Sequence, residues 1–215
     1  NTSEYGIINV HPSLLPKYRG PNPYYQTIIH GETQTGITFH LMDVNYDTGG
    51  ILHQKEVPVL PDDNASSLKH RCCETVFKEV RVLLKNFDNN IKYVVSQNEN
   101  YATYFHNISE DELILKFEKE TALETDRRIR ALFVRTKTLI PFNNAFFTFE
   151  SYKICPKPSK KPPASIIKIT DDSFYIVCKD GVVMCFSGIK LKSVFHGFKT
   201  KSFIKKYVKI DSKAV

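Results

Sequence analysis

The sequence has no long apolar run, and this absence argues against a membrane-spanning helix. Nowhere among its 215 residues do about 18 apolar residues follow one another, which is the minimum for a helix that crosses a bilayer. The chain begins at Asn1 instead of Met, and no secretory leader follows, so we expect a fragment or a chain whose start is missing. Hydrophobic residues make up 41% and charged residues 25%, which is ordinary globular composition and argues against disorder.

Cysteine is too sparse and too irregular for a disulfide scaffold or a zinc site. The chain has five cysteines, an odd number, and no Cys-x-x-Cys pair. Its seven histidines also lack the spacing that zinc ligands show. We therefore expect a cytoplasmic protein with reduced thiols that pack as small apolar side chains, with no metal and no membrane partner.

Acidic charge is scarce in the last part of the chain. Residues 1–120 carry 11 basic and 16 acidic side chains, whereas residues 121–215 carry 19 basic and 7 acidic ones. The net charge changes from −5 to +12 between these parts. This asymmetry predicts two domains, of which the second faces a polyanion such as nucleic acid. Charge alone leaves a lysine-rich solvated surface as the alternative.

Apolar periodicity in the first part of the chain predicts an α/β arrangement. Asn22 can cap a short helix, with Pro23 in its first turn and Gly31 at its end. A longer helix follows, in which apolar residues recur at intervals of three and four positions and should form a buried stripe. These residues are Leu68, Cys72, Val76, Val80, Leu83, Leu84 and Phe87. The expected elements are strands over 5–10, 35–42 and 50–57 and helices over 24–30 and 66–87.

The second part of the chain has the pattern of a small β-domain. Asp180-Gly181 separates two short β-type runs, 174–178 and 182–186, which predicts a hairpin. Further strands are expected around 165–170 and 203–210, and one short helix over 124–132. We expect a polar linker over 98–121, followed over 122–215 by a basic domain that forms a small barrel of the oligonucleotide-binding (OB) type.

Asn9, His11 and Asp47 are the residues that can carry chemistry. A strand that ends in Asn-x-His places both polar side chains on one face, because strand side chains alternate. An amide can donate to a developing oxyanion, a histidine can donate or shuttle a proton, and a carboxylate can orient the imidazole. By itself such a pair is more typical of a turn or of a core histidine.

The surrounding sequence resembles the folate-dependent formyltransferases. The resemblance is carried by NVHPSLLPKYRG at 9–20, GETQTGIT at 31–38, MD at 42–43 and DTGGIL at 47–52, in matching order and spacing. Three later stretches are similar to the linker and domain-junction motifs of methionyl-tRNA formyltransferases: ATY at 102–104, RIRAL at 128–132 and PFNNAF at 141–146. The resemblance is strong through residue 57 and weakens beyond about residue 150.

This resemblance implies a fold, an activity and a set of roles. Residues 1–97 would be the C-terminal portion of a Rossmann-like formyltransferase catalytic domain. The enzyme would transfer a formyl group from 10-formyltetrahydrofolate, without a metal. Asn9 and His11 would stabilise the tetrahedral oxyanion, and Asp47 would pair with His11 and help to take the proton of the amine. The residues implied to lie at the folate co-substrate are Ser13, Leu14, Leu15, Pro16 and Asp43.

Two features depart from the family pattern. Pro12 stands where many methionyl-tRNA formyltransferases have Gly, and the Pro form is common in glycinamide ribonucleotide transformylases and sugar N-formyltransferases. Tyr18-Arg19-Gly20, in contrast, differs from the purine enzyme. About a hundred residues that the family places before the catalytic strand are absent here, so we expect little or no turnover by this chain alone. Whether Arg19 contacts the acceptor or buttresses its loop stays open.

The acceptor has three candidates. An initiator methionyl-tRNA, with a role in protein biosynthesis, accounts for the basic second part, because clustered cations bind phosphates. A nucleotide sugar fits Pro12 and residues 102–105, and a noncatalytic RNA-binding remnant is the third reading. Phe195, His196 and Phe198 lie among the cations and can equally belong to a core. The candidate nucleic-acid-binding residues are Arg127, Arg128, Arg130, Lys160, Lys161, Lys190, Lys192, Lys199, Lys201, Lys205 and Lys206.

Overall fold

A computed structural model of the chain describes residues 5–132, 138–142 and 145–192. Contacts divide the chain into two compact units, Asn1–Ile108 and Ser109–Val215. The segment 98–121, which we expected as a linker, is therefore shared between the two units. No helix among the described residues is both long enough and apolar enough to cross a membrane.

The first unit is built on a three-stranded antiparallel sheet. Its strands are β1 (Ile8–His11), β2 (Gln34–Leu41) and β3 (Ile51–Pro58), in the order β1-β2-β3. The central strand β2 is buried from Thr35 to His40, as expected for a strand that pairs on both sides. The predicted first strand begins later than expected, at Ile8, and it is only partly buried.

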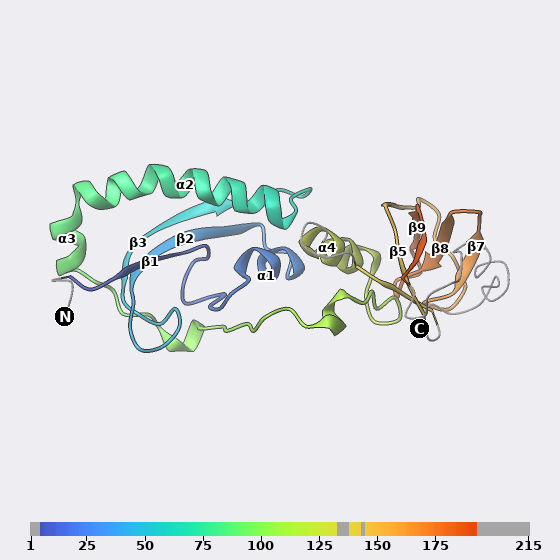
Figure 1. The fold of residues 1–215 in the computed structure, drawn as a ribbon, viewed down its shortest axis with the longest axis horizontal. Helices are drawn as coiled ribbons and strands as arrows, with labels where there is room; N and C mark the ends of the chain where they lie inside the picture. Colours follow the sequence, from blue (N-terminus) through green and yellow to red (C-terminus); the bar gives the residue numbers. More distant parts are fainter. Residues whose placement is uncertain (1–4, 133–137, 143–144, 193–215) are drawn as a thin grey trace. The chain divides into compact units, whose positions relative to one another are not determined.

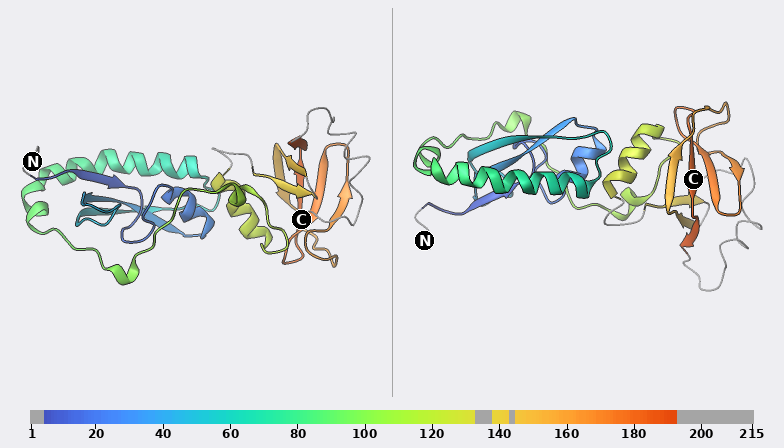
Figure 2. Two further views of the ribbon diagram at one scale, coloured as in Figure 1. Left: turned by 60° about the horizontal axis from the view of Figure 1, so that its bottom comes forward. Right: turned by 90° about the horizontal axis from the view of Figure 1, so that it is seen from above.

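Two helices complete the α/β arrangement of this unit. The helix α1 (Pro23–Ile29) has Pro in its first turn, and Asn22 stands at its N-cap but makes no capping hydrogen bond with its side chain. The long helix α2 (Ala65–Lys85) runs along the sheet and is followed by α3 (Phe87–Lys92) (Figures 1 and 2). Asn64 caps α2 by accepting from the backbone N–H groups of Ser66 and Ser67.

The apolar face of α2 is narrower than its sequence predicted. Leu68, Cys72 and Leu83 are buried, as the spacing of three and four residues requires. Leu84 belongs to the same predicted stripe but is 64% exposed, because it follows Leu83 by one position and a helix turns by about 100° per residue. A 3-10 turn, η1 (Glu99–Tyr101), lies in the segment that follows α3.

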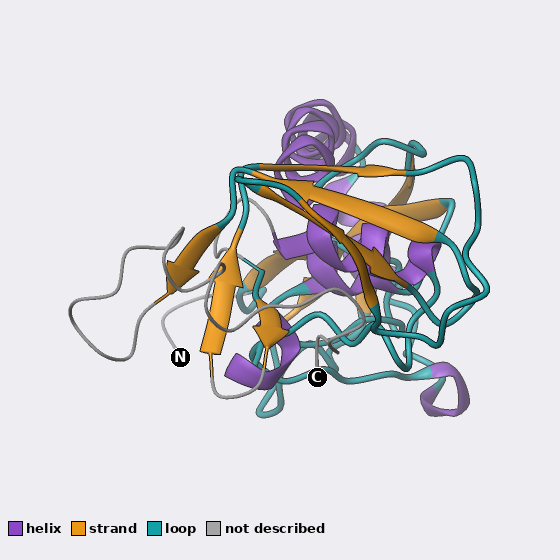
Figure 3. Ribbon diagram, turned by 90° about the vertical axis from the view of Figure 1, so that its right-hand side faces the viewer, coloured by secondary structure: helices purple, strands orange, loops and turns teal. Residues whose placement is uncertain are grey.

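The second unit consists of short strands with one described α-helix (Figure 3). The predicted hairpin is confirmed: β8 and β9 pair antiparallel around Gly181, which has φ +78° as this tight turn requires. The elements of this unit are η2 (Glu110–Leu113), α4 (Ala122–Leu132), β4 (Ile140–Phe142), β5 (Ala145–Thr148), β6 (Ser151–Ile154), β7 (Ile166–Ile169), β8 (Ser173–Val177), β9 (Val183–Ser187) and β10 (Lys190–Lys192).

The described strands of the second unit form two sheets and no closed barrel. One sheet has the order β10-β5-β4 and the other β6-β9-β8-β7. The strand expected over 203–210 lies outside the described residues. An OB-type barrel is thus not established, although the short strands, the tight hairpin and the single helix agree with the expectation for a small β-domain.

An aromatic core joins α4 to the strands of the second unit. Phe149 and Phe174 contact further rings edge to face, and Phe186 contacts Phe149 at a centroid distance of 4.9 Å. Ile129 of α4 is fully buried in the same cluster. The carboxylate of Asp180, in the β8–β9 turn, accepts from the first N–H of α4. The hairpin turn therefore also fixes where α4 begins.

Candidate active site

The pairing of β1 with β2 gathers polar side chains at one place in the first unit. Asn9 and His11 are two positions apart on β1 and so lie on the same face of the strand. The register places Asn9 opposite His40 of β2, and the Asn9 Nδ2 group lies 3.2 Å from His40 Nε2. Since His40 Nδ1 donates to the Leu41 carbonyl at 2.9 Å, a neutral His40 accepts at Nε2. This contact orients the Asn9 amide.

Asp47 reaches these residues from the loop between β2 and β3. Its backbone has φ +60°, in the left-handed region that Asp tolerates better than most residues. The Gly20 N–H donates to Asp47 Oδ2 at 2.9 Å. The other oxygen, Oδ1, lies 3.4 Å from His11 Nδ1 and 3.5 Å from Asn9 Nδ2. The structure therefore brings Asn9, His11 and Asp47 together around one carboxylate oxygen.

The hydrogen bond to Tyr18 determines which ring nitrogen of His11 carries the proton. His11 Nε2 lies 2.8 Å from the Tyr18 carbonyl, which can only accept, so Nε2 carries a hydrogen. In the neutral ring Nδ1 then carries no hydrogen, and its lone pair faces Asp47 Oδ1. A proton placed on Nδ1 would be shared with that carboxylate. The pair is thus arranged to receive one proton.

Burial and charge separate the pKa values of this pair. Burial lowers the pKa of His11, and although the Tyr18 carbonyl and Asp47 raise it, the net pKa is below its ordinary value. Burial raises the pKa of Asp47, but the neighbouring His40, the hydrogen bond from the Gly20 N–H and the nearby His11 outweigh it, so that pKa is lowered. Near neutral pH the ring is a free base beside an ionised carboxylate.

A cavity of about 490 Å³ opens onto the three side chains. Asn9, His11 and Asp47 all line it, so they face the same space. Its aromatic lining includes Tyr24 and Tyr46, and no Lys or Arg lines it among the described residues. The cavity is large enough for a small organic ligand. An amide N–H, a proton-accepting imidazole and a carboxylate in one cavity can stabilise an oxyanion and accept a proton from an attacking amine.

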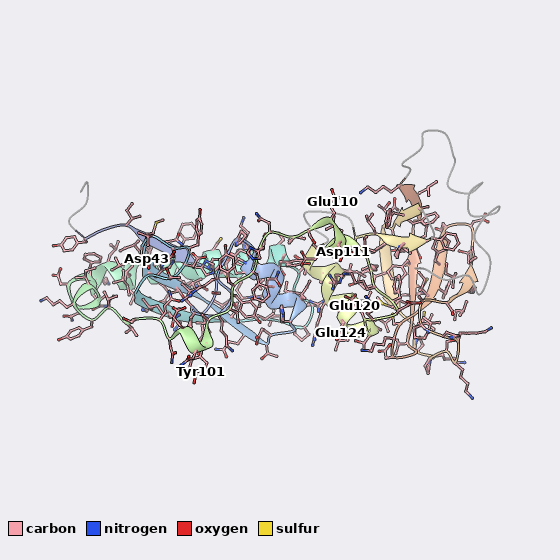
Figure 4. The ribbon with its side chains drawn as sticks, turned by 90° about the horizontal axis from the view of Figure 1, so that it is seen from below. Asp43, Tyr101, Glu110, Asp111, Glu120 and Glu124 are labelled. Atoms are coloured by element: carbon pink, nitrogen blue, oxygen red, sulfur yellow. The ribbon has the colours of Figure 1, made fainter. Side chains whose placement is uncertain are left out.

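The residues predicted to bind the co-substrate do not line this cavity. Ser13 and Leu15 are buried, and Thr38 Oγ1 links them by donating to the Ser13 carbonyl and accepting from the Leu15 N–H. Leu14 lines a separate, smaller cavity. Asp43 is exposed in the β2–β3 loop, where it accepts from the Thr48 hydroxyl at 2.7 Å (Figure 4). Neither these four residues nor Pro16 is among the residues that line the larger cavity.

Several cations predicted to bind phosphate are held by acidic side chains of the second unit. Arg128 pairs with Glu120, Arg130 with Asp126, and Lys190 with Glu150. Figure 4 labels Glu120, which precedes α4, and Glu124, which lies in its first turn. The guanidinium groups of Arg128 and Arg130 are therefore not freely presented to solvent. Of the remaining candidates, Arg127 is half-buried, Lys160, Lys161 and Lys192 are exposed, and Lys199, Lys201, Lys205 and Lys206 lie outside the described residues, as do Phe195, His196 and Phe198.

Two residues at the site were missed by the sequence analysis. His40 is a polar residue in an otherwise apolar strand, and that interruption was a usable signal. Gln97 donates from Nε2 to the carbonyls of Asp47 and Gly49, both at 2.8 Å. Nothing local marks Gln97, because its partners lie about fifty positions earlier. Among the described residues no group of three or more His, Cys, Asp or Glu side chains is placed to hold a metal ion.

Similarity to known proteins agrees with this geometry. Residues 1–85 match the formyl transferase family. The chain is 34% identical over 181 residues to the methionyl-tRNA formyltransferase of Ehrlichia ruminantium (strain Gardel), an alignment that covers 84% of this chain. A relative from the Welgevonden strain shows the same identity. The chain spans only 57% of the length of these curated relatives.

Solved structures show the same fold. An N-formyltransferase from Helicobacter canadensis, in complex with folinic acid and dTDP-3-aminofucose, matches 84% of this chain and 65% of its own, with a TM-score of 0.64 and 22% identity. The methionyl-tRNA formyltransferase from Clostridium thermocellum matches 86% of this chain and 67% of its own, with a TM-score of 0.59 and 16% identity. These likenesses show the fold, and residues 1–85 match the formyl transferase family directly.

Proposed function

We propose that the protein transfers the formyl group of 10-formyltetrahydrofolate to an amine, and that this amine is the methionyl group of initiator tRNA. The observation that carries the proposal is the meeting of Asn9, His11 and Asp47 in one cavity. The family of residues 1–85 and the curated relatives at 34% identity support the same chemistry. A role in one-carbon transfer for protein biosynthesis fits the cytoplasmic location expected from the reduced thiols.

The geometry supports a stepwise acyl transfer. The amine nitrogen attacks the formyl carbon, and the carbonyl electron pair moves onto oxygen. An N–H of Asn9, whose amide His40 orients, donates to this oxyanion. His11 Nδ1 takes the proton of the new ammonium group, and Asp47 stabilises the resulting imidazolium. When the oxyanion collapses, the carbon–N10 bond breaks and the proton passes to the leaving nitrogen.

The charge of the second unit supports a tRNA acceptor. Residues 1–108 carry 9 basic and 11 acidic side chains, whereas residues 109–215 carry 21 basic and 12 acidic ones. The net charges are −2 and +9, and an excess of cations attracts phosphates. We propose that exposed lysines such as Lys160 and Lys192 belong to this nucleic-acid-binding surface, and that the unit completes an OB-type barrel.

A nucleotide sugar is the second candidate for the acceptor. The cavity is lined by Tyr24, Tyr46 and Tyr104 and, among the described residues, by no cation. Aromatic rings suit a sugar or a base, and a structural neighbour was solved with dTDP-3-aminofucose. The basic second unit has no role in this alternative. A noncatalytic RNA-binding protein is the third candidate, in which the second unit alone would act.

A pair of measurements separates the three candidates. The first measures formyl transfer by the full-length protein that contains this chain, from 10-formyltetrahydrofolate to methionyl-initiator tRNA and to a dTDP-aminosugar. The second measures the affinity for tRNA across a salt series, where phosphate contacts make the affinity fall steeply as salt rises. The proposal predicts transfer to tRNA and a steep salt dependence. Transfer to the sugar with weak, salt-insensitive tRNA binding would establish the second candidate. Binding of tRNA without any transfer would establish the third.

A further inference from the structure

Arg19, whose role the sequence left open, forms hydrogen bonds with Gln97 and Glu99. Arg19 is 5% exposed, and its guanidinium forms a fork with the carboxylate of Glu99, Nη1 to Oε2 at 2.9 Å and Nη2 to Oε1 at 2.7 Å. It also donates to Gln97 Oε1 from Nε at 3.1 Å and from Nη2 at 2.7 Å. Arg19 therefore buttresses the segment around residues 97–99 and does not point into the cavity, among whose lining residues it does not appear.

Gln97 connects this cation to the loop that carries Asp47. Its Oε1 accepts two N–H groups from Arg19, and its Nε2 donates to the carbonyls of Asp47 and Gly49, both at 2.8 Å. Arginine can only donate and a carbonyl can only accept, so the amide has a single allowed orientation. Every donor and acceptor of this side chain is used. The amide therefore acts as a rigid bridge between Arg19 and the loop.

The loop needs such support because its backbone is constrained at two places. Asp47 has φ +60°, which a residue with a side chain adopts only when its surroundings require it. A Cβ added to Gly49 would lie 1.8 Å from the Leu41 carbonyl oxygen, so the loop passes directly against β2. Both constrained residues are the ones whose carbonyls Gln97 holds.

The segment that carries Gln97 is also hydrogen-bonded to Tyr18 and Arg19, which follow His11 in the chain. The Arg19 N–H donates to the Thr103 carbonyl at 2.9 Å, and the Phe105 N–H donates to the Arg19 carbonyl at 3.0 Å. The Thr103 hydroxyl accepts from the Tyr18 N–H at 2.8 Å. Figure 1 shows this segment running along the sheet on the side away from α2. Residues 97–105 thus form a strap that is bonded both to the residues after His11 and to the Asp47 loop.

We propose that Gln97, oriented by Arg19, is a positioning residue that holds the Asp47 carboxylate beside His11. This inference rests on the proposed function, in which Asp47 must stabilise His11 as it accepts a proton. It assigns a role to a residue outside the segment 1–85 that matches the family. Gln97 touches the loop backbone only, so it acts through Asp47 and is not itself catalytic.

The test is the pKa of His11, measured by NMR titration in the whole chain, with the His11 signal identified by its loss in His11→Gln. The groups that face this ring are the Asp47 carboxylate, His40 and the Tyr18 carbonyl. Asp47→Asn removes the negative charge and should lower the His11 pKa by about 1 unit. Gln97→Met, of similar size but unable to make the four bonds, should shift the pKa in the same direction by a smaller amount.

The matched control is Asn64→Ala, which also removes two hydrogen bonds from the first unit, at the start of α2. It should leave the His11 pKa unchanged. If Gln97→Met does not fold, Arg19→Lys serves instead, because it keeps a cation for Glu99 but loses the Nε and Nη2 donors that orient Gln97. A folded Gln97→Met or Arg19→Lys variant with the wild-type His11 pKa would overturn the proposal, and so would a shift in the opposite direction.

Activity gives a second readout. In a formyl-transfer assay, Gln97→Met should lower kcat by about tenfold to a hundredfold and leave KM for the amine close to its original value, because the misplaced group is needed only for the reaction. A change confined to KM would contradict the proposal. The titration needs neither formyl donor nor acceptor, so its failure would leave the proposed function intact. The transfer assays use the full-length protein that contains this chain, and absence of transfer by its unaltered form would refute the function alone.

Discussion

The two units of this chain differ in the kind of contact that orders each of them internally. The second unit has a contiguous apolar core in which rings such as Phe147 and Phe186 are fully buried. In the first unit, apolar side chains are left on the surface: of the large exposed apolar residues in the described ranges, all but Leu123 and Ile154 lie there. The first unit instead orders its loops with buried polar side chains, among them Arg19 and Asp63.

This difference indicates which unit depends on apolar packing for its stability and which unit carries the functional residues. Packing dominates the stability of a core, and a buried polar network fixes geometry at a cost in desolvation. The residues that bear chemistry, Asn9, His11 and Asp47, belong to the polar network of the first unit. Substitutions in the core of the second unit should therefore reduce stability most, whereas substitutions of Asn9, His11 or Asp47 should reduce activity.

The largest effect on stability is expected in the aromatic core. Phe186 is fully buried and contacts the rings of Phe117, Phe149 and Tyr152. Phe186→Ala should lower the free energy of unfolding of the second unit by about 3–5 kcal/mol, because it leaves a cavity in a close-packed cluster. Chemical denaturation followed by circular dichroism measures this change. A loss below about 1 kcal/mol would mean that the cluster is not the source of stability.

A smaller and pH-dependent effect is expected from an ion pair of the first unit. Asp63 accepts from Arg71 at 2.5 and 2.8 Å and from the Leu60 N–H at 2.7 Å. Burial raises the pKa of Asp63, but these hydrogen bonds outweigh it and hold that pKa below its ordinary value. Asp63→Asn should lower the free energy of unfolding by about 1–3 kcal/mol at pH 7, since hydrogen bonds to a charged group are lost.

The sign of this pH dependence follows from the lowered pKa. A carboxyl group whose pKa is lower in the folded state stabilises the fold above its unfolded value of about 4, and that contribution disappears as the pH falls through the folded value. The difference between wild type and Asp63→Asn should stay constant from pH 7 to about 5 and shrink below about 4. Denaturation curves at a series of pH values test this. A difference that grows on acidification would contradict the assigned pairing.

The smallest effect is expected at an exposed ring of the first unit. Phe77, on α2, is 74% exposed. Phe77→Ala should change the free energy of unfolding by no more than about 0.5 kcal/mol, the range of ordinary surface substitutions. The same denaturation assay applies, and Phe186→Ala is the matched comparison because the same side chain is removed. Equal losses in the two variants would erase the contrast between the units.

The parts of the structure that depend on nearby residues were predictable from the sequence. The hairpin at Asp180-Gly181 formed as predicted, because turn chemistry is local. Asn9 and His11 share a face because strand alternation is local as well. Asp47 was a candidate for orienting the imidazole, and the family resemblance implied its pairing with His11, but its geometry beside His11 required the structure.

The contacts between distant residues were not predictable in this way. The spacing of α2 suggested that Leu84 is buried, but the face of a helix that is covered depends on what packs against it. Arg128 was a candidate for phosphate, yet Glu120 binds it, which no local pattern indicates. Gln97 lies fifty positions from the carbonyl of Asp47 that it holds. Such partners are set by tertiary packing.

The central claim is that His11, with Asn9 and Asp47, carries out formyl transfer. Its most direct test is the transfer rate of His11→Ala in the full-length protein that contains this chain, with 10-formyltetrahydrofolate and the acceptor that wild type uses. Loss of the ring should lower kcat by about a hundredfold to ten-thousandfold, the range for a side chain that takes a proton during the reaction. The near-ultraviolet circular dichroism spectrum of His11→Ala should match that of wild type, which shows that the variant is folded. A folded His11→Ala variant that transfers formyl groups at close to the wild-type rate would contradict the account.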